Sequence, residues 1–464
     1  MKLAILGGGG ARMPAFVRLV LASQSAAFDE ICLFDPDPLR RDTIGRLAVE
    51  LAGVLGHPDV VQVTADAEQA LTNADFVFSA IRVGGDRGRV IDEDVALRRG
   101  LVGQETTGPG GCAMALRTIP VVLSYCEMLS RWSPGAVLIN FTNPAGLITQ
   151  AILTQGLVPA VGVCDTPGGT LERLAGFLGA EDDSSLSYSY GGLNHLGWVS
   201  SLRLAGQERL GELLARYEEL QRFDHRFAAF DPALVRRVGA VPTEYLYYFY
   251  DASRYLRDVE RAGTSRGQDV LRLNEELLSE LAKAFADGDV HDAWARYRTV
   301  MGVRGDTYMR TDMEGDSGQA AARARRAAAA PATIGEVRAG GYESLALRVI
   351  DGLTGRSPAE LIVNTRNGQS LEFLDPDDVV EVPARVDRAG VSPRQVTDLP
   401  RAARGLAMQV KEYERGIVEA AMSGDAELAG TALALHPLVP GITAARELLA
   451  EYRERHGQHL AYLG

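Results

Sequence analysis

A cysteine and a histidine near the middle of the chain are of the residue types that bind divalent metal ions. Cys164 lies in the segment Gly-Val-Cys-Asp-Thr-Pro, and His195 lies in Gly-Gly-Leu-Asn-His-Leu-Gly-Trp. A thiolate and an imidazole suit a borderline divalent ion, and two protein ligands leave coordination positions open for water or substrate oxygens. A lone cysteine at a strand end is more often a small core residue, and a lone histidine is more often structural. The spacing alone leaves both interpretations open.

A run of four glycines close to the start of the chain predicts a site for a dinucleotide phosphate. The run Gly7–Gly10 follows an apolar segment and precedes Ala11 and Arg12. Glycines between a strand and a helix let the backbone approach a pyrophosphate at the helix N-terminus. The spacing departs from the full G-x-G-x-x-G pattern, because Arg12 and its neighbour occupy the tail of the motif. Asp35 ends the next apolar run, where a carboxylate can hydrogen-bond an adenosine ribose and favour NAD over NADP.

Strands and helices alternate through the first third of the chain, around these candidate residues. We predict strands over residues 3–6, 30–35, 59–64, 76–81, 136–142 and 160–164, and a helix over 14–22. Such alternation predicts an α/β fold with a doubly wound parallel sheet, in which ligands bind at the carboxyl ends of the strands. The residues expected to contact the cofactor are Gly7, Gly8, Gly9, Gly10, Ala11, Arg12, Asp35, Arg82, Val83 and Asn140.

From about residue 184 the pattern changes to mixed strands and helices. We predict strands over 186–190, 199–204, 361–367 and 379–386, and helices over 209–222, 254–261, 269–286 and 399–422. An Ala/Arg-rich stretch over 323–330 is predicted as a surface helix or connection. The chain is therefore expected to have a Rossmann-like NAD-binding domain over 1–167 and a mixed α+β domain over 168–464 for substrate, metal and subunit contacts. This is an architecture like that of lactate and malate dehydrogenases.

The composition is that of an ordinary globular protein. Of 464 residues, 46% are hydrophobic and 23% are charged, which is typical of globular domains. The net charge of −13 argues against a nucleic-acid partner, which needs a basic surface. The longest apolar runs are of strand length, so no membrane span is expected. Four cysteines in a chain of this size do not suggest a disulfide framework, and we predict a cytoplasmic location.

Beyond these inferences, the sequence resembles glycoside hydrolase family 4, the NAD- and metal-dependent glycosidases, and within it the 6-phospho-β-glucosidases. The resemblance runs nearly from end to end. It depends on the motifs Gly7–Gly10, Ile81–Gly85, Gly103–Gly111, Asn140–Gly146, Gly162–Pro167, Gly192–His195, Val241–Tyr248, Val363–Asn367 and His436–Pro440.

The resemblance implies a glycosidase chemistry that differs from the usual pair of carboxylates. NAD⁺ takes hydride from C3 of the sugar, and a metal held by Cys164 and His195 binds the C2 and C3 oxygens. Tyr245 removes the acidified C2 proton, elimination expels the C1 substituent, water adds, and NADH returns the hydride without net redox change. Tyrosine is a weak base with a usual pKa of about 10, and a nearby cation would lower that pKa. Without the resemblance, Tyr245 would be interpreted as an aromatic core residue.

The resemblance also implies a pocket for the 6-phosphate of a phosphorylated glucoside or disaccharide. Arg266 is the best positional match for a phosphate ligand and Arg82 is the second, since a planar guanidinium donates two hydrogen bonds. Asn143 matches an asparagine that contacts substrate near the metal, and Asn194 adjoins the histidine ligand. Glu105 lies close to the nicotinamide in relatives, and its role here stays open.

Asp165 departs from the pattern of the 6-phospho-β-glucosidases, which usually have asparagine at this position. In the 6-phospho-α-glucosidases an aspartate there is the proposed acid that protonates the leaving oxygen. Asp165 could do the same if it holds its proton. The remaining motifs resemble the β branch, so the anomeric preference and the aglycone stay open. The segment 304–318 matches the common pattern poorly, so the nature of the anionic group at C6 also stays open.

Two other classes of function are considered beside the glycosidase. A dehydrogenase of the lactate/malate type would share the nucleotide-binding fold and release NADH, and a non-catalytic sensor would bind NAD without metal-stimulated turnover. The resemblance favours Mn²⁺ among the divalent ions that such ligands accept. It also implies a homodimer or homotetramer.

Overall fold

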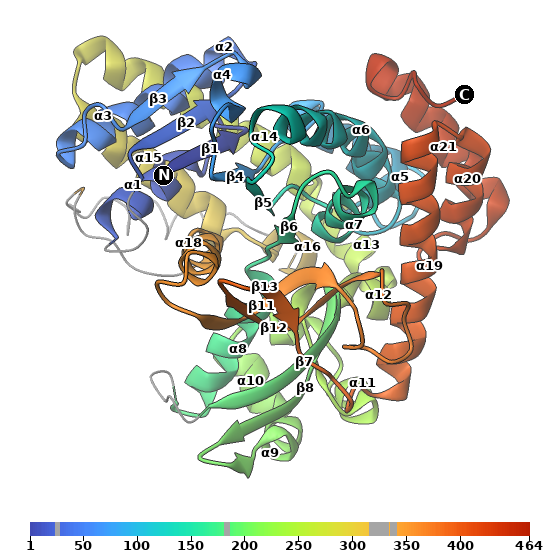
Figure 1. The fold of residues 1–464 in the computed structure, drawn as a ribbon. Helices are drawn as coiled ribbons and strands as arrows, with labels where there is room; N and C mark the ends of the chain where they lie inside the picture. Colours follow the sequence, from blue (N-terminus) through green and yellow to red (C-terminus); the bar gives the residue numbers. More distant parts are fainter. Residues whose placement is uncertain (24–27, 181–185, 315–333, 335–340) are drawn as a thin grey trace.

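Six parallel strands form one half of a mixed sheet in the computed structural model, which describes residues 1–23, 28–180, 186–314, 334 and 341–464. Their order across the sheet is β3-β2-β1-β4-β5-β6 (Figure 1), the order of a dinucleotide-binding sheet. The six strands are β1 Lys2–Leu6, β2 Glu30–Phe34, β3 Val61–Thr64, β4 Phe76–Ser79, β5 Val137–Asn140 and β6 Ala160–Gly162. The predicted parallel sheet is therefore confirmed.

The same sheet continues beyond β6 as antiparallel strands in the order β11, β12, β7, β8 and β10, with β13 paired to β12 and β9 to β8. Their bounds are β7 Ser187–Leu193, β8 Leu196–Leu204, β9 Gln207–Glu208, β10 Val241–Pro242, β11 Ala359–Arg366, β12 Val379–Asp387 and β13 Gly390–Pro393. The sheet thus runs unbroken past residue 167. The predicted mixed α+β part is confirmed, and the division into two domains at that residue stays a prediction.

Helices cover the parallel half of the sheet on both faces. They are α1 Met13–Ala22, α2 Pro38–Arg40, η1 Arg41–Gly45, α3 Arg46–Val54, α4 Ala67–Leu71, α5 Gly85–Leu97, α6 Gly108–Trp132, α7 Ala145–Gln155 and α8 Thr166–Phe177. Buried side chains of α1, α3 and α18 pack on one face together with β1 and β2, and those of α6 and α7 pack on the other. The parallel strands are therefore held between two layers of core side chains, one on each face of the sheet. The carboxyl ends of these strands are the ends that we predicted to meet.

The second half of the chain adds helices around the antiparallel strands. They are α9 Leu210–Ala215, α10 Tyr217–Phe223, η2 Phe227–Ala229, α11 Pro232–Val238, η3 Glu244–Leu246, α12 Tyr247–Tyr250, α13 Ala252–Ala262, α14 Arg266–Asp287, α15 Val290–Asp306, α16 Arg310–Glu314, α18 Gly341–Leu353, α19 Arg401–Ser423, α20 Ala426–Leu435, α21 Ile442–His456 and η4 Gly457–His459. The C-terminal helices α19 to α21, red in Figure 1, pack beside α5, α6 and α7.

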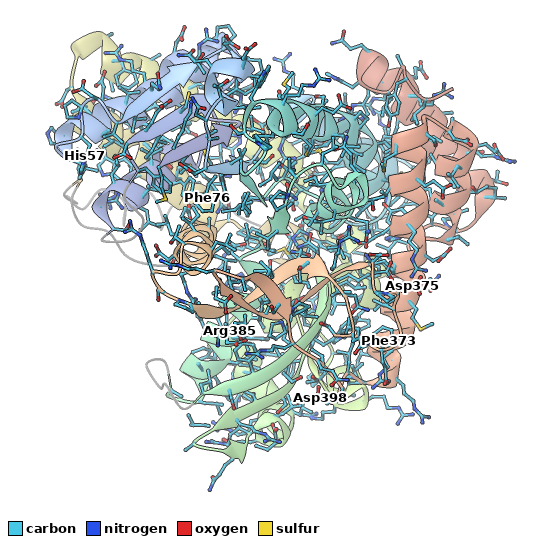
Figure 2. The ribbon with its side chains drawn as sticks, viewed as in Figure 1. His57, Phe76, Phe373, Asp375, Arg385 and Asp398 are labelled. Carbon is cyan, nitrogen blue, oxygen red and sulfur yellow. The ribbon has the colours of Figure 1, made fainter. Side chains whose placement is uncertain are left out.

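Side chains fill the spaces that the ribbon leaves open, as Figure 2 shows. Asp398, labelled near the bottom of that view, accepts hydrogen bonds from Ser189 Oγ at 2.6 Å and Ser200 Oγ at 3.0 Å. These bonds tie the chain that follows β13 to the hairpin of β7 and β8. That hairpin carries the predicted histidine ligand in its turn.

Two predicted helices differ from the structure at their ends. The predicted helix 209–222 is two helices, because the backbone of Arg216 leaves the helical region at φ −97°, ψ 24°. The predicted helix 269–286 begins earlier, at Arg266, because Ser265 and Gln268 form a capping box that satisfies the first backbone donors. The predicted surface helix over 323–330 lies outside the described residues.

Helix α6 is a longer apolar segment than the sequence led us to expect, because we expected apolar runs of strand length only. Among the described helices, it is the one that is long and apolar enough to cross a membrane, yet 67% of its apolar window is buried inside the protein. Its Arg117 forms a fully buried ion pair with Asp92 at 2.6 Å. Such burial is typical of a core helix that is covered by protein on several sides, and it explains the apolar composition.

Candidate active site

A cavity of about 1220 Å³ lies at the carboxyl ends of the parallel strands. Gly7, Asp35, Ala80, Phe141 and Val163 line it, and each of them directly follows one of the strands β1, β2, β4, β5 and β6. The residues that follow five strands thus meet in one cavity, where ligands bind in open α/β sheets.

The glycine run forms the turn between β1 and α1 at one wall of this cavity. The backbone N–H groups of Gly7 and Gly8 donate to the carbonyl oxygen of Phe34 at 3.0 and 2.8 Å, which holds the turn against β2. Gly7 has φ +87°, and a Cβ atom there would lie 2.7 Å from the carbonyl oxygen of Ala80. A larger residue would both strain the backbone and displace the neighbouring strand. The turn and the N-terminus of α1 therefore form a cradle that suits a pyrophosphate.

Asp35 is buried beside this turn and is tied to the backbone. Its Oδ2 atom accepts from the N–H of Gly9 at 2.8 Å, and its Oδ1 atom accepts from the N–H of Asp37 at 3.0 Å. Burial raises the pKa of the Asp35 carboxyl, against these hydrogen bonds. The carboxyl still lines the cavity, so each oxygen keeps acceptor capacity for a ribose hydroxyl.

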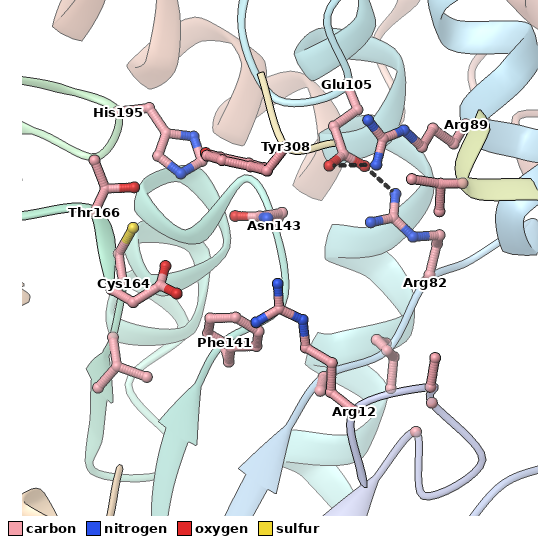
Figure 3. Close-up of a pocket in the computed structure, with 18 of the residues that line it drawn as sticks. Arg12, Arg82, Arg89, Glu105, Phe141, Asn143, Cys164, Thr166, His195 and Tyr308 are labelled. Carbon is pink, nitrogen blue, oxygen red and sulfur yellow. Dashed lines mark hydrogen bonds and ion pairs between the residues drawn. The ribbon is translucent and has the colours of Figure 1, made fainter. Parts of the chain in front are cut away.

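Cys164 and His195 line one end of the same cavity, and Figure 3 shows the Cys164 sulfur pointing toward the imidazole ring. The Nδ1 atom of His195 lies 2.9 Å from Thr106 Oγ1, whose hydroxyl donates to Gln104 Oε1 at 2.9 Å. Gln104 Oε1 also accepts from two backbone N–H groups, those of Thr106 and Thr107, which assigns this atom as the oxygen. His195 Nδ1 then donates to Thr106, and Nε2 keeps its lone pair.

This donor set fits a divalent metal ion. Burial lowers the pKa of His195 to about 4, so the ring is neutral and can act as a ligand. Burial raises the pKa of the Cys164 thiol, and Glu381 and Asp165 nearby add to that effect, so a cation is what would favour the thiolate. Among the described residues no three His, Cys, Asp or Glu side chains converge as a metal site. The remaining positions of a bound ion would be left to water or substrate, as catalytic sites require.

Tyr245 stacks on the His195 ring, with centroids 3.8 Å apart and planes 2° from parallel. Its hydroxyl accepts a hydrogen bond from Tyr308 at 3.0 Å. Burial raises the pKa of Tyr245 well above its usual value, and the Tyr308 hydrogen bond opposes that rise. The phenol hydroxyl thus has a donor partner that would stabilise its anion.

Two arginines and two glutamates link the cavity to the start of α14. Arg82 Nη1 lies 2.5 Å from Glu105, and Arg89 Nη1 lies 2.9 Å from the other oxygen of the same carboxylate, as the dashed lines of Figure 3 mark. These contacts lower the pKa of Glu105 to about 2, against its burial. Arg89 also pairs with Glu93 at 2.8 Å, and Glu93 accepts from the N–H of Gly267 at 2.6 Å. The chain of alternating charges holds Arg82 at the cavity wall.

Arg266 and Arg304 bring further positive charge to the cavity. Arg266 donates to Thr307 Oγ1 at 3.0 Å and to the carbonyl oxygen of Arg304 at 2.8 Å. Burial, together with the nearby guanidinium groups of Arg12 and Arg266, lowers the pKa of Arg304 to about 9. Like charges packed this closely indicate a site for an anion, which would relieve their repulsion.

Comparison with known proteins identifies the family. Residues 2–180 match the model of the family 4 glycosyl hydrolases, and residues 190–439 match the model of their C-terminal domain. The chain belongs to glycosyl hydrolase family 4.

Relatives within family 4 include enzymes named for both anomers. A probable 6-phospho-β-glucosidase of Bacillus subtilis strain 168 is 29% identical and covers 99% of this chain and 97% of its own. A 6-phospho-α-glucosidase of Lacticaseibacillus paracasei is 26% identical over 97% of this chain and 96% of its own. A solved structure of the Thermotoga maritima 6-phospho-β-glucosidase with manganese, NAD⁺ and glucose-6-phosphate has a TM-score of 0.78 and 25% identity, and covers 100% of both chains. The alternative of a lactate/malate-type dehydrogenase is not favoured.

Most of the site residues predicted for this family 4 chain lie at the cavity. Those that line it are Gly7, Gly10, Ala11, Arg12, Asp35, Arg82, Val83, Asn143, Cys164, Asp165, His195, Tyr245 and Arg266. The other four do not line it: Gly8, Gly9, Asn140 and Asn194.

The two asparagines away from the cavity are engaged in holding the backbone. Asn140 is fully buried, and its amide donates to Thr149 Oγ1 at 3.1 Å and to the carbonyl oxygen of Thr142 at 3.3 Å. Asn194 donates to Glu381 Oε1 at 3.1 Å instead of facing the cavity. Both side chains thus have partners within the protein, and their predicted ligand contacts stay predictions.

Several cavity residues of the family 4 chain were missed from the sequence: Arg89, Arg304, Tyr308 and Asp312. Arg89 lies one helical turn after the Arg-Val-Gly-Gly motif, and that spacing on the start of a helix could have indicated it. The other three belong to the segment that matches the common pattern poorly, so no motif pointed to them.

Proposed function

We propose that the protein hydrolyses 6-phospho-β-glucosides, with NAD and a divalent metal ion, Mn²⁺ by preference, as its cofactors. The observation that carries this proposal is the meeting of Cys164, His195 and Tyr245 in one cavity whose opposite wall is the glycine turn (Figure 3). The names of the relatives, and the ligands in the Thermotoga maritima structure, support the substrate and both cofactors.

Cys164 and His195 Nε2 would hold the metal ion, and the glycine turn with Asp35 would hold NAD. When bound, NAD supplies a reversible hydride acceptor at C3 and the metal ion supplies positive charge beside the sugar oxygens. Tyr245 would take the proton from C2, and Tyr308 would stabilise the resulting phenolate through its hydrogen bond. The enclosing walls keep these groups away from bulk water, which strengthens each electrostatic contact.

The guanidinium groups of Arg266, Arg304 and Arg89 support binding of the substrate's 6-phosphate. All three line the cavity, and they are brought together by α5, α14 and α15. A phosphate would accept charge-assisted hydrogen bonds from these planar donors. Neutralisation of the packed cations would add to the affinity of the substrate.

A second candidate is the hydrolysis of 6-phospho-α-glucosides, and Asp165 is the observation that favours it. Asp165 follows the cysteine ligand directly and lines the cavity. A carboxyl at this position can donate a proton to the leaving oxygen. Relatives of both anomeric types match this chain at similar identity, so the anomer is the point that an assay must decide.

The deciding experiment is the hydrolysis of the α and β anomers of p-nitrophenyl 6-phosphoglucoside. Each reaction contains NAD⁺ and Mn²⁺, each cofactor is omitted in turn, and a parallel reaction runs in deuterated water. We expect cleavage that needs both cofactors, releases no free NADH and incorporates deuterium at C2. Cleavage that is indifferent to NAD⁺, or steady accumulation of NADH, would contradict the proposed function.

We also propose a cytoplasmic homodimer or homotetramer. The four cysteines are free and buried, as in proteins of a reducing compartment. Exposed apolar side chains of α19 to α21, among them Met408 and Leu435, each 50% exposed, support subunit contacts there. Light scattering of the purified protein at micromolar concentration tests the assembly, and a monomer would contradict it.

A further inference from the structure

A carboxylate is buried in the middle of the mixed sheet, outside the cavity. Glu381 on β12 is 1% exposed, and its carboxylate accepts three hydrogen bonds. The donors are Tyr190 Oη at 2.6 Å, Asn194 Nδ2 at 3.1 Å and Asn364 Nδ2 at 3.1 Å. A carboxylate is costly to bury, so its presence at this point indicates a role beyond packing.

Glu381 lies in a row of paired residues that crosses the sheet from the cysteine strand to the histidine hairpin. In this row Gly162 of β6 pairs with Asn364 of β11, Asn364 pairs with Glu381, Glu381 pairs with Gly192 of β7, and Gly192 pairs with Gly197 of β8. Within the described residues, β6 pairs with β11 at one position and β12 pairs with β7 at one position, and both positions belong to this row. The row therefore contains both junctions: the one that joins the parallel and antiparallel parts of the sheet, and the one that joins β12 to the β7–β8 hairpin.

The row leaves no room for other side chains. A Cβ atom on Gly197 would lie 1.9 Å from the hydroxyl of Tyr190, which donates to Glu381. A Cβ atom on Gly162 would lie 2.4 Å from Thr149 Oγ1 and 2.8 Å from the Cβ atom of Asn364. The side chains of Tyr190 and Asn364, which both donate to Glu381, thus occupy the space over Gly197 and Gly162 and fix the separation of the strands.

The two candidate metal ligands lie next to this row, one on each side of Glu381. Cys164 follows Gly162 by two residues, and His195 follows Asn194, whose side chain is bound by Glu381. His195 has φ +62°, a left-handed conformation that a non-glycine residue adopts at a cost. The hydrogen bond from Asn194 to Glu381 holds the turn in that conformation.

We infer that Glu381 is a positioning residue that sets the metal affinity of the site by fixing the cysteine strand relative to the histidine turn. This inference rests on the proposed function, because it assumes that Cys164 and His195 bind the ion. Residues behind metal ligands orient them, and their loss weakens metal binding by about 10- to 100-fold. The proposed NAD site is formed by β1, β2 and the glycine turn. These elements lie in the parallel part of the sheet, and β6, β5 and β4 separate them from β11 and β12.

The experiment compares Mn²⁺ and NAD⁺ affinities of the full-length protein by titration calorimetry. The test variant is Glu381→Gln, which keeps the shape but replaces one of the two acceptor oxygens with an amide NH₂. We expect Mn²⁺ to bind about 10- to 100-fold more weakly, with NAD⁺ affinity within twofold of wild type. Asn194→Ala removes the hydrogen bond between the histidine turn and Glu381 but keeps the carboxylate, and it should also weaken Mn²⁺ binding. This variant tests the inference if Glu381→Gln does not fold.

The matched control is Asp378→Asn, which removes a buried carboxylate just before the same strand. Asp378 is 4% exposed and accepts from Arg415 Nε at 2.9 Å and from the N–H of Asp375 at 2.9 Å, away from the histidine turn. Its Mn²⁺ affinity should equal that of wild type. Unchanged Mn²⁺ binding in Glu381→Gln, or an equal loss of Mn²⁺ and NAD⁺ binding, would overturn the inference. A wild-type protein that binds no Mn²⁺ would refute the proposed metal site itself.

Discussion

Removal of one hydroxyl group, in Tyr308→Phe, tests whether Tyr245 acts as the base. Tyr308 donates a hydrogen bond to the Tyr245 hydroxyl at 3.0 Å. This bond becomes stronger when Tyr245 carries negative charge, and a hydrogen bond to a charged group contributes about 1.5–3 kcal/mol. Its loss should lower kcat about 10- to 150-fold, since each 1.36 kcal/mol corresponds to a tenfold change in rate.

The KM for the substrate should change little in Tyr308→Phe, because the lost interaction strengthens only as the C2 proton leaves. The assay is the steady-state hydrolysis of the preferred p-nitrophenyl 6-phosphoglucoside with saturating NAD⁺ and Mn²⁺. A substrate deuterated at C2 should show a larger isotope effect in the variant than in wild type, because proton removal becomes slower relative to the other steps.

Tyr247→Phe is the matched control for this experiment. Tyr247 lies two residues after Tyr245 and is fully buried, but its hydroxyl donates to Asp258 at 3.3 Å and it does not line the cavity. Its kcat should stay within about twofold of wild type, since no charge develops beside it. A kcat of Tyr308→Phe equal to that of Tyr247→Phe would refute the assignment of Tyr245 as the base.

Three further predictions concern the ligands, the anomer and acid stability. Cys164→Ser and His195→Ala should each abolish Mn²⁺-dependent turnover while NAD⁺ affinity, measured by calorimetry, stays near wild type; wild-type activity in either variant would remove the metal hypothesis. Asp165→Asn should reduce α-anomer cleavage more than β-anomer cleavage when both are assayed in parallel, and equal effects would remove its role as the acid. Burial lowers the pKa of His436 to about 3 in the folded protein, whereas an unfolded histidine has a pKa of about 6.5. Between these two pH values the unfolded chain binds a proton that the folded protein does not, so the free energy of unfolding should fall as pH falls from 6.5 toward 4. In His436→Gln this slope should be shallower by up to about 1.4 kcal/mol per pH unit, as urea unfolding would show, and an unchanged slope would contradict it.

The parallel sheet could be predicted from sequence because each of its strands is a short apolar run that ends in a glycine or a polar residue. Those end residues meet at one edge of any parallel sheet, so Gly7, Asp35 and Cys164 could be assigned to one cavity without coordinates. The strand order beyond β6 could not be predicted in this way. It depends on β11 and β12, which come almost two hundred residues later in the chain and insert beside β6.

The orientation of individual side chains was the part of the site that the sequence could not supply. Asn194 adjoins a candidate ligand, yet in the turn after β7 its side chain faces Glu381. Tyr308 lies in a segment without a recognisable motif, yet α15 ends so that its hydroxyl reaches Tyr245. Contacts of this kind join residues that are 63 or 187 positions apart, and no local pattern records them.

The joining of the two sheet halves at one row has a consequence for how the protein can deform. Strands that touch at a single position can twist against each other with little loss of hydrogen bonding, and the touching position then acts as a pivot. In such a rotation, atoms near the pivot are displaced least and atoms at the far ends of the strands are displaced most. Any twist about this row would therefore change the spacing between Cys164 and His195, next to the row, less than the spacing of groups at the far ends of the strands.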